Sequence, residues 1–335
     1  MSVITMDDVA KSLRSFDHQG VTFWDLTSIT YRGHIWRHLI DAIATKYRGE
    51  EIDMIVGLDA RGFFFSGALG YAMGIGMVPI RKKGKLPGKT FQYEYRKEYE
   101  GDGDNNLDIF EIQDLDYIKK GARVLVVDDV LATGGTAKAA CELVEAVGGE
   151  VVGLAFGIEL PFLAGRSQLV EYPITSEISI LDGKPYGNVK HCVDMIGLKD
   201  PELLAGELIL VDRLNNPTGL ALPGGKIDFG QSIRQAAQRE YGEETGFSCQ
   251  MLDFQAVLAN ANRDYRDGFH HVSHVVTVAI TGGKRKGEGH KTKVVEWPTT
   301  GDVLPGHEQF ALDHGHFLSQ HWKSIAPDLR PKEAA

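Results

Sequence analysis

The sequence of 335 residues predicts two α/β domains in one chain. In its first half, strand-like runs alternate with helical runs, and this order is typical of a parallel sheet flanked by helices. Residues 181–188 then have the Gly, Pro, Asn and Asp content of a linker. Beyond the linker, two strand-like runs precede a helix that carries three glutamates. We therefore expect domains over residues 1–183 and 188–335, because the length suffices for two cores.

Composition narrows the class of protein. Hydrophobic residues make up 43% of the chain and charged residues 24%, which is typical of globular proteins. The net charge of −10 argues against a nucleic-acid partner and against an anionic membrane surface. The three cysteines, Cys141, Cys192 and Cys249, lie far apart without metal-ligand spacing, so we expect a reducing, cytoplasmic environment. Residues 1–13 are polar and do not have the pattern of a signal peptide.

The elements of the first half are predicted in order from apolar runs and the residues that end them. The expected elements are strands over 52–60, 76–83, 122–129 and 150–160, and helices over 63–74 and 136–148. Residues 63–80 are long and apolar enough to be considered as a membrane span, but their glycines and Pro79 favour a helix followed by a strand. Residues 82–106 are polar, charged and too long for an ordinary connection, so we expect a functional lid.

The most informative stretch is Val124–Thr136, with the sequence VLVVDDVLATGGT. Its β-branched run predicts a buried parallel strand, and Asp128 and Asp129 stand at the end of that run, where open α/β sheets bind ligands. The loop that follows consists of Ala132, Thr133, Gly134, Gly135 and Thr136, and it leads into a helix. Free backbone N–H groups there suit a phosphate beside a polyol. The alternatives are an ordinary glycine-containing turn or an acidic Mg²⁺ pocket, and no GK[ST] follows that would make a P-loop.

This stretch resembles the phosphoribosyl-pyrophosphate (PRPP) loop of type I phosphoribosyltransferases. The resemblance implies that Asp128 and Asp129 bind the ribose hydroxyls, and that the loop over residues 132–136 binds the 5′-phosphate. The surrounding sequence is similar to adenine phosphoribosyltransferase in four segments: 20–29, 55–90, 94–100 and 151–169. That family implies a type I phosphoribosyltransferase fold, Mg²⁺, adenine and PRPP as ligands, and AMP and pyrophosphate as products. We also expect a homodimer.

Basic residues near the acidic pair suit the anionic substrate. Arg61 follows the first predicted strand and can present a fork of donors to pyrophosphate oxygens, although a surface ion pair with Asp59 is the alternative. A basic run lies in and before the predicted lid, and in that place it is expected to screen substrate charge, with Lys85 as a PRPP contact. An ordinary solvated face is the alternative for this run. Its members are Arg81, Lys82, Lys83, Lys85 and Lys89.

The family resemblance also implies a base site. Phe23 would stack on adenine, Leu160 would pack on the other face of the base, and the backbone near Thr22 and Trp24 would contact its edge. Trp24 stands where the family usually has Arg, which leaves the base preference open.

Glu98 and Tyr99 match a pair of lid residues in the same family. Glycosyl transfer of this type passes through an oxocarbenium-like state. A lid that excludes water would strengthen electrostatic stabilisation and suppress hydrolysis of PRPP.

A second motif covers residues 225–247. Glu240, Glu243 and Glu244 are spaced so that they share one face of a predicted helix, where like charges cost about 0.2–0.5 kcal/mol per pair. Clustered carboxylates that bind Mg²⁺ or Mn²⁺ explain such a concentration. The spacing resembles the Nudix box, in which only Gln231 departs from the pattern, by replacing a Glu. This resemblance implies an α/β/α sandwich and metal-dependent hydrolysis, with an inert nucleotide-binding domain as the alternative.

The surroundings of the box suggest a substrate. Residues 263–275 and 310–317 resemble the ADP-ribose pyrophosphatase branch of the Nudix family. Arg263 and Arg266 would then contact phosphate or ribose, or else lie on the surface of a hairpin. The general base stays open among Glu288, Glu296 and Glu308. The chain as a whole is expected to be a bifunctional enzyme whose two activities both release AMP, with a transferase that carries a nucleotide-sensing Nudix domain as the rival.

Overall fold

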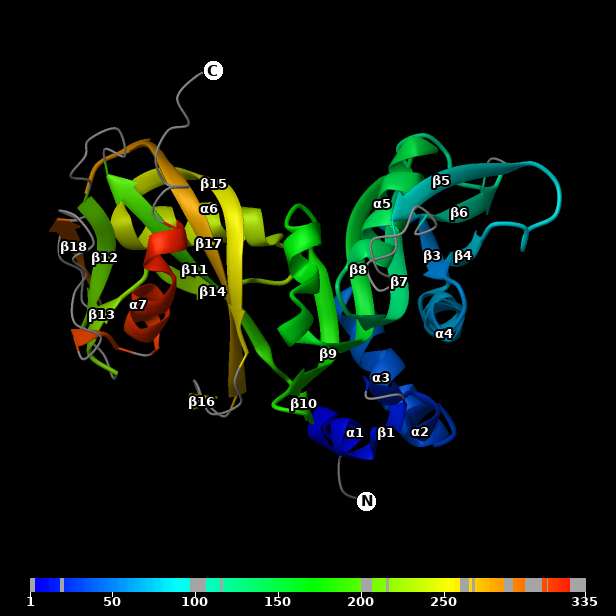
Figure 1. The fold of residues 1–335 in the computed structure, drawn as a ribbon. Coiled ribbons are helices and arrows are strands. Elements are labelled where there is room, and N and C mark those ends of the chain that lie inside the picture. The colour runs from blue at the N-terminus through cyan, green and yellow to red at the C-terminus, as the bar shows by residue number, and fades with distance from the viewer. Residues whose placement is uncertain are drawn as a thin grey trace. The chain divides into compact units, whose positions relative to one another are not determined.

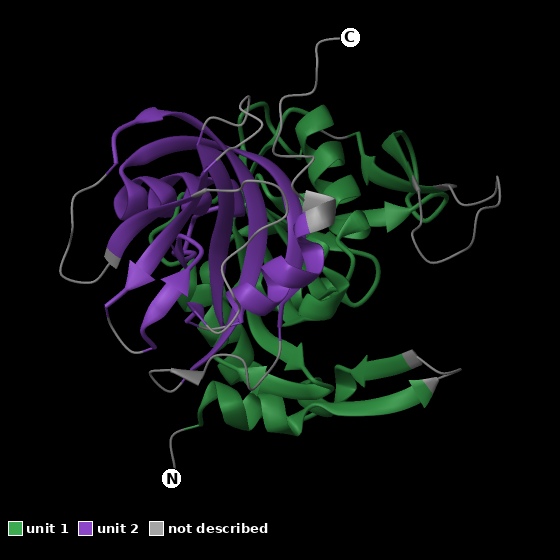
Figure 2. Ribbon diagram, turned by 60° about the vertical axis from the view of Figure 1, so that its left-hand side comes forward, with its two compact units in different colours: residues 1–189 green, residues 190–335 purple. Residues whose placement is uncertain are grey.

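The computed structural model divides into two compact units, Met1–Val189 and Lys190–Ala335, coloured separately in Figure 2. The residues that the structure describes are 4–18, 21–96, 107–114, 117–199, 207–214, 217–259, 265–266, 269–285, 292–298, 309–311 and 313–325.

The first unit is built on an eight-stranded sheet in the order β10-β9-β8-β7-β3-β4-β6-β5 (Figure 1). Its five central strands are parallel, and antiparallel strands extend it at both edges. The predicted parallel sheet is therefore confirmed. The strands are β3 (Met54–Leu58), β4 (Gly76–Lys82), β5 (Thr90–Arg96), β6 (Leu107–Gln113), β7 (Arg123–Leu131), β8 (Glu150–Glu159), β9 (Ile174–Leu181) and β10 (Lys184–Gly187).

Helices cover both faces of this sheet, because its central strands are apolar on both sides. Ile55 packs in a core with α3 (Gly33–Lys46) and α4 (Gly62–Met73). Its neighbour Val56 packs in a second core with α5 (Gly135–Ala146), on the opposite face. Alternation along a strand separates the two cores. The 3-10 turns η1 (Pro161–Leu163) and η2 (Gly165–Leu169) follow β8.

A two-stranded sheet, β1 (Arg14–His18) with β2 (Val21–Asp25), lies apart from the main sheet of the first unit, between α1 (Met6–Ser12) and α2 (Thr27–Thr30) along the chain. Trp24 is buried in the core that α3 and α4 share, whereas its strand neighbour Phe23 is exposed. β2 therefore presents one aromatic side chain to the core and the next to the outside.

Two expectations for the first unit need correction. The strand predicted to end at Asp129 continues to Leu131, because β7 keeps its pairing with β8 as far as that residue. The segment 82–106 is not all lid, since residues 90–96 form β5, which pairs with β6. The strand that pairs with β5 is β6, which lies outside the segment 82–106. The polar composition of this segment therefore did not reveal the hairpin.

The apolar stretch 63–80 forms most of α4 and β4, the predicted helix and strand. None of the helices in the described part of the chain is long and apolar enough to cross a bilayer.

The second unit contains an eight-stranded sheet with β11 at its centre. β11 runs parallel to β17 and antiparallel to β12 and β14, while β15 extends the sheet beyond β17. Its elements are β11 (Lys190–Lys199), β12 (Glu207–Arg213), β13 (Gly219–Ala221), β14 (Gly224–Lys226), α6 (Ile233–Thr245), β15 (Phe247–Leu258), β16 (Tyr265–Arg266), β17 (Phe269–Gly283), β18 (Thr292–Pro298) and α7 (His314–Ile325).

Helices α6 and α7 lie on opposite faces of β11. Ile196 and Leu198 pack against Phe317, Leu318 and Trp322 of α7. Gly197, between them, faces the side chain of Tyr241 on α6 so closely that a Cβ there would overlap the phenol oxygen. Alternation along the strand thus produces the predicted α/β/α sandwich.

Candidate active sites

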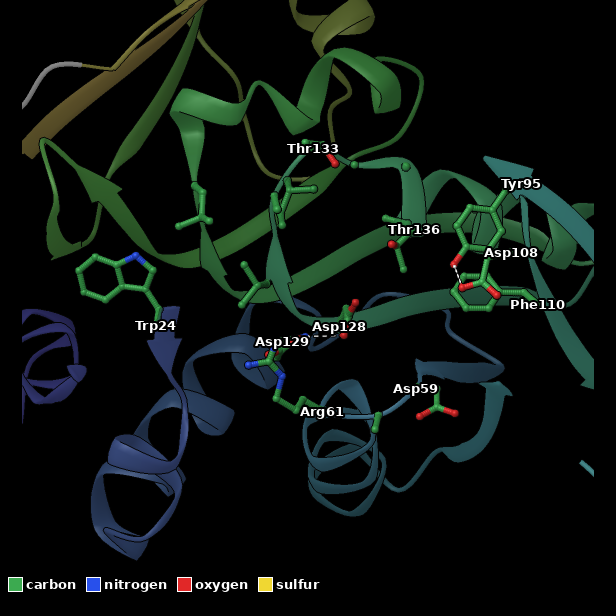
Figure 3. Close-up of a pocket in the computed structure, with 18 of the residues that line it drawn as sticks. Trp24, Asp59, Arg61, Tyr95, Asp108, Phe110, Asp128, Asp129, Thr133 and Thr136 are labelled. Carbon is green, nitrogen blue, oxygen red and sulfur yellow. Dashed lines mark hydrogen bonds and ion pairs between the residues drawn. The ribbon is translucent and has the colours of Figure 1, made fainter. Parts of the chain in front are cut away.

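A cavity of about 450 Å³ opens at the carboxyl end of the sheet in the first unit. The end of β7, the loop over residues 132–136, the start of α4 and the exposed side of β2 line it (Figure 3). Open α/β sheets bind ligands at this edge. The structure therefore gathers the predicted acidic pair, the glycine-rich loop and the β2 aromatic residues around one space.

Arg61 and Asp129 lie next to each other in the lining of this cavity (Figure 3). Arg61 Nε lies 2.9 Å from Asp129 Oδ2, so the alternative of an Arg61–Asp59 pair is wrong; Asp59 instead accepts from Arg81 at 3.1 Å. Asp128 Oδ1 accepts a hydrogen bond from the backbone N–H of Asp129 at 2.8 Å. Burial and then the neighbouring charge of Asp129 raise the pKa of Asp128 well above its ordinary value. Hydroxyl or cationic ligands would relieve this repulsion.

The loop after β7 has the geometry of a phosphate cradle. Gly134 has a φ of 91°, and a Cβ at this position would lie only 2.3 Å from the carbonyl oxygen of Gly165. Only glycine meets both conditions. The chain enters α5 at Gly135, and Thr133, Thr136 and Ala132 line the cavity beside it. The backbone N–H groups at the start of α5 are thus available to an anion at the helix N-terminus.

The β2 side of the cavity carries the residues predicted for base binding. Thr22, Phe23, Trp24 and Leu160 all line it. The side chain of Phe23 is 45% exposed, which is unusual for a core aromatic residue and suits a stacking surface. The guanidinium carbon of Arg61 lies 5.0 Å from the centre of this ring, so the cation now occupies one face of Phe23.

The opposite wall contains a cluster that the sequence did not reveal as a unit. Lys82 Nζ lies 3.2 Å from Asp108 Oδ2, and the Tyr95 hydroxyl donates to the same oxygen at 3.4 Å. Burial, followed by the charge of Asp108, raises the pKa of Tyr95. Lys82 belonged to the predicted basic run, but its partners lie on β5 and β6, and only the strand register brings them together.

One predicted residue, Lys85, is not among the described residues that line the cavity. Lys85 is exposed, and it is Lys82 that lines the cavity in the described structure, because the backbone of Lys85 is tied into the loop below. Glu98 and Tyr99 lie outside the described residues.

The second candidate site lies where α6 meets β14. A capping box between Ser232 and Gln235 starts this helix, and Gly246 ends it with a φ of 82°. Glu244 Oε2 accepts from the backbone N–H of Gly224 at 2.9 Å. Gly225 lies so close to Glu240 that a Cβ there would overlap the carboxylate at 2.2–2.3 Å. The lack of a side chain at Gly225 thus allows Glu240 to approach the strand, while the backbone N–H of Gly224 holds Glu244.

Glu243 does not approach the strand as Glu240 and Glu244 do. Its side chain is 60% exposed, whereas that of Glu240 is 13% exposed. Successive helical residues are about 100° apart, so Glu243 turns away from Glu244 even though it is three residues from Glu240. The expectation of three carboxylates on one face therefore holds for Glu240 and Glu244 but not fully for Glu243.

Arg239 connects the charged groups of the second site. Its guanidinium forms ion pairs with Glu240 at 2.8 Å, with Glu243 at 3.3 Å and with Asp228 at 3.1 Å. It also donates to Gln231 Oε1 at 3.1 Å. The amide oxygen of Gln231 thus accepts from Arg239 at the position where the Nudix pattern has a Glu.

A second group of residues missed in the sequence lies behind the glycines. His314 accepts from the backbone N–H of Leu222 at its Nδ1 (3.1 Å), so its proton is on Nε2, which donates to Asp194 Oδ2 at 3.1 Å. Asp194 is buried and sits opposite Gly224 in the strand register. The loop over residues 222–225 is therefore held from both sides of the sheet.

The remaining residues predicted for the second unit are two arginines and three glutamates. Arg263, Glu288 and Glu308 lie outside the described residues, and Arg266 is described only as a backbone position in β16. Glu296 is paired with Lys199 at 2.7 Å, and this hydrogen bond lowers its pKa. A carboxylate held in this way is a poor proton acceptor.

The donor set at α6 fits a divalent cation chemically, although no group of three or more His, Cys, Asp or Glu in the described ranges is already gathered to hold one. Burial raises the pKa of Glu244 to about 7, and burial also raises the pKa of Glu240. Buried carboxylates that lack sufficient positive charge are stabilised when a metal ion supplies it.

Comparison with known proteins distinguishes the two halves of the chain. Residues 26–169 match the family model described as phosphoribosyl transferase domain, and residues 192–320 match the NUDIX domain. The adenine phosphoribosyltransferase of Chloroflexus aurantiacus is 47% identical over 178 residues, which are 52% of this chain and 99% of that relative. The one from Roseiflexus sp. is 46% identical over 171 residues, 51% of this chain and 95% of the relative. A crystal structure of adenine phosphoribosyltransferase from Thermoanaerobacter pseudethanolicus is 39% identical and has a TM-score of 0.48, covering 51% of this chain and 98% of that chain.

Proposed function

Since the chain belongs to the adenine phosphoribosyltransferase family through its first half and carries a NUDIX domain in its second, we propose that it is a bifunctional enzyme. The first unit would transfer phosphoribosyl from PRPP to adenine, giving AMP and pyrophosphate. The second would hydrolyse ADP-ribose, or a similar nucleoside diphosphate compound, to AMP and a sugar phosphate. We assign the transferase to the first unit and the hydrolase to the second. The boundary lies slightly beyond the predicted linker over residues 181–188, because residues 184–187 form β10 and pair with β9 in the first unit's sheet.

The observation that supports the transferase best is the set of groups that line one cavity. An exposed aromatic ring, an arginine that contacts both this ring and Asp129, a pair of carboxylates and a glycine-rich loop at a helix N-terminus all border it. These groups suit a base, a pyrophosphate, ribose hydroxyls and a 5′-phosphate. In our proposal Asp128 and Asp129 accept from the ribose hydroxyls, and the N–H groups near Gly134 and Gly135 hold the 5′-phosphate.

The pyrophosphate leaving group would face Arg61 and Lys82. Positive charge at this place stabilises the charge that develops as the glycosidic C–O bond breaks. Mg²⁺, when bound with PRPP, would neutralise the same oxygens, and Asp128 and Asp129 are among the described carboxylates that line the cavity and could support it, together with Asp59 and Asp108. Thr22, Phe23, Trp24 and Leu160 would orient the base so that its nitrogen attacks the anomeric carbon.

The transferase is tested by incubating the full chain with PRPP, Mg²⁺ and either adenine or hypoxanthine. We expect AMP from adenine, and a kcat/KM for hypoxanthine lower by about 10²-fold or more, because a site that hydrogen-bonds the amino edge of adenine leaves groups unpaired with an oxo base. Chromatography of the nucleotide products measures both rates. Equal turnover of the two bases would reject adenine selectivity, and no AMP would reject the transferase.

For the second unit, ADP-ribose hydrolysis rests on the carboxylates at α6. Glu240 and Glu244 would hold Mg²⁺ or Mn²⁺, with Glu243 as an outer contributor, and the metal would polarise the pyrophosphate and activate water. Arg263 and Arg266 stay proposed contacts to phosphate or ribose. The competing proposal is a nucleotide sensor without turnover, which Gln231 favours because an amide oxygen stands where the Nudix pattern has a carboxylate. AMP formation from ADP-ribose with Mg²⁺ separates the two.

We also propose that the enzyme works as a homodimer in the cytoplasm. The three cysteines are free, which suits a reducing compartment. The support for a dimer is on α4, where Phe64 is 62% exposed and Tyr71 is 92% exposed, seven residues apart and so on one helical face. Aromatic side chains in such a row are typical of a surface that another subunit covers.

Accordingly, the double variant Phe64→Glu/Tyr71→Glu is expected to be a monomer, whereas the wild-type chain has twice the monomer mass. The new carboxylates would be buried in the interface without partners. The free energy needed to remove them from water exceeds the net free energy of association of an interface of ordinary size. Light scattering after size exclusion measures the mass. Phe162→Glu, at an equally exposed aromatic residue outside α4, is the control and should not change the mass. A wild-type monomer would contradict the proposal.

A further inference from the structure

The basic loop, residues 81–89, folds around a buried carboxylate. Glu111 on β6 is 3% exposed and stands opposite Arg81 in the pairing of β4 with β6. Its Oε1 accepts from the backbone N–H groups of Lys85 at 3.1 Å and Leu86 at 3.4 Å. Its Oε2 accepts from the Thr90 hydroxyl at 3.1 Å and from the side-chain amide of Gln92. Four donors therefore meet on one carboxylate.

None of the four donors to Glu111 is a cationic side chain of the loop. Five basic side chains lie in this loop, yet within the described ranges Glu111 forms no ion pair with any of them. Burial alone would raise its pKa, but the hydrogen bonds from Thr90 and from the loop amides lower the pKa below its ordinary value. The charge of Glu111 is thus used to hold the backbone of the loop, which leaves its cations available for other contacts.

The fixed loop is connected to the wall of the cavity. The carbonyl oxygen of Lys85 accepts from Arg81 Nη1 at 3.3 Å, and Arg81 Nε donates to Asp59 at 3.1 Å. Asp59 lines the cavity two residues before Arg61. Lys82, the next residue after Arg81, also lines the cavity. Hydrogen bonds therefore link Glu111 through Lys85 and Arg81 to Asp59, and the proposed pyrophosphate contacts are close neighbours in the chain of Asp59 and Arg81.

We propose that Glu111 is a positioning residue for pyrophosphate recognition: it anchors the basic loop and so sets the places of Lys82 and, through Arg81 and Asp59, of the segment that carries Arg61. This inference rests on the proposed transferase function. It assigns a role to a side chain that would not itself touch the substrate.

The variant Glu111→Gln tests whether Glu111 acts on PRPP binding by holding the loop or only through its negative charge. The two possibilities predict opposite changes in the affinity for PRPP. Removing a negative charge near an anion site makes anion binding tighter if Coulomb energy alone decides. If Glu111 holds the loop, binding becomes weaker, because one neutral amide oxygen replaces two charged oxygens, so two of the four donors lose their acceptor and the hydrogen bonds that remain are no longer made to a charged group. The direction of the change in PRPP affinity therefore decides between the two.

The experiment uses the full chain and measures kcat, the KM for PRPP, the KM for adenine and inhibition by pyrophosphate. For Glu111→Gln we expect the KM for PRPP and the inhibition constant of pyrophosphate to rise about tenfold, as for one lost hydrogen bond to a charged group. The KM for adenine should stay within about twofold. Thr90→Val removes a single donor to Glu111 and should shift the PRPP values in the same direction by less. This milder variant also serves if Glu111→Gln folds poorly.

Glu94→Gln is the charge-matched control, since Glu94 is exposed on the neighbouring strand β5. It measures the Coulomb effect without touching the loop and should leave PRPP binding equal or slightly tighter. Unchanged or tighter PRPP binding in both Glu111→Gln and Thr90→Val would overturn the proposal. An equal rise in both KM values would also overturn it, as a sign of general damage. If the wild-type chain makes no AMP from adenine and PRPP, the transferase function is rejected and this inference with it.

Discussion

Replacement of Arg61 by alanine is expected to lower kcat/KM for PRPP by about 10²–10³-fold, because it removes a fork of charged donors from the pyrophosphate. The same variant should bind adenine more tightly when PRPP is absent. The guanidinium now lies 5.0 Å from the centre of the Phe23 ring and occupies a face on which the base would stack. Such a contact at a partly exposed site is worth about 0.5–1 kcal/mol, so its removal should increase adenine affinity about two- to fivefold.

Two titrations measure these opposite effects: adenine binding to the PRPP-free protein by calorimetry, and steady-state rates with varied PRPP. Arg32→Ala is the matched control, because Arg32 stacks on Tyr31 at 4.7 Å and does not line the cavity. Arg61→Lys keeps the charge without the fork and should fall between wild type and alanine. If adenine binds more weakly to Arg61→Ala than to the wild type, the guanidinium does not compete with the base for Phe23.

One part of the predicted cavity lining lies close together in the chain. Asp128, Asp129 and the loop over residues 132–136 form one continuous stretch, and the strand that carries them can be predicted from its apolar pattern. Their relation to Phe23 required the family resemblance, because no local property connects residue 23 with residue 129. The local sequence thus predicts a phosphate-binding loop, whereas only the fold determines which residues lie on the other walls of the cavity.

The residues that were missed depend on strand register or on distant segments. Asp108 and Tyr95 meet Lys82 because β4, β5 and β6 pair in one register, which a polar segment does not specify. His314 meets Asp194 across 120 residues of sequence. Glu243 was expected beside Glu240 and Glu244, but helical spacing alone does not tell which of three acidic residues the sheet covers. In each case the contact depends on tertiary packing, which the local sequence pattern does not predict.

In the second unit, Glu244→Gln is expected to reduce metal-dependent hydrolysis of ADP-ribose by about 10²-fold or more, while it stabilises the metal-free protein. Burial raises the pKa of Glu244 from 4.5 to about 7. A raised folded-state pKa means that the stabilising contribution is complete below pH 4.5 and is lost as the pH rises through 7. At pH 8 the ionised carboxylate therefore costs about 3 kcal/mol, at 1.36 kcal/mol for each unit of pKa difference. Glutamine cannot ionise and should avoid that cost.

The pH dependence of metal affinity tests the same carboxylate without reference to turnover. Mn²⁺ must displace the proton of Glu244, so its affinity should fall about tenfold for each pH unit below 7 and level off above it. Glu243→Gln, at the exposed acid of the same helix, should change affinity and rate much less. Mn²⁺ titrations at several pH values, thermal unfolding without metal and AMP release from ADP-ribose make up the measurement. Normal hydrolysis by Glu244→Gln would place the reaction elsewhere. Binding of ADP-ribose without hydrolysis in the wild type, with altered transferase kinetics, would instead favour a nucleotide sensor in the second unit, because the donor set would then bind the metal but fail to activate water.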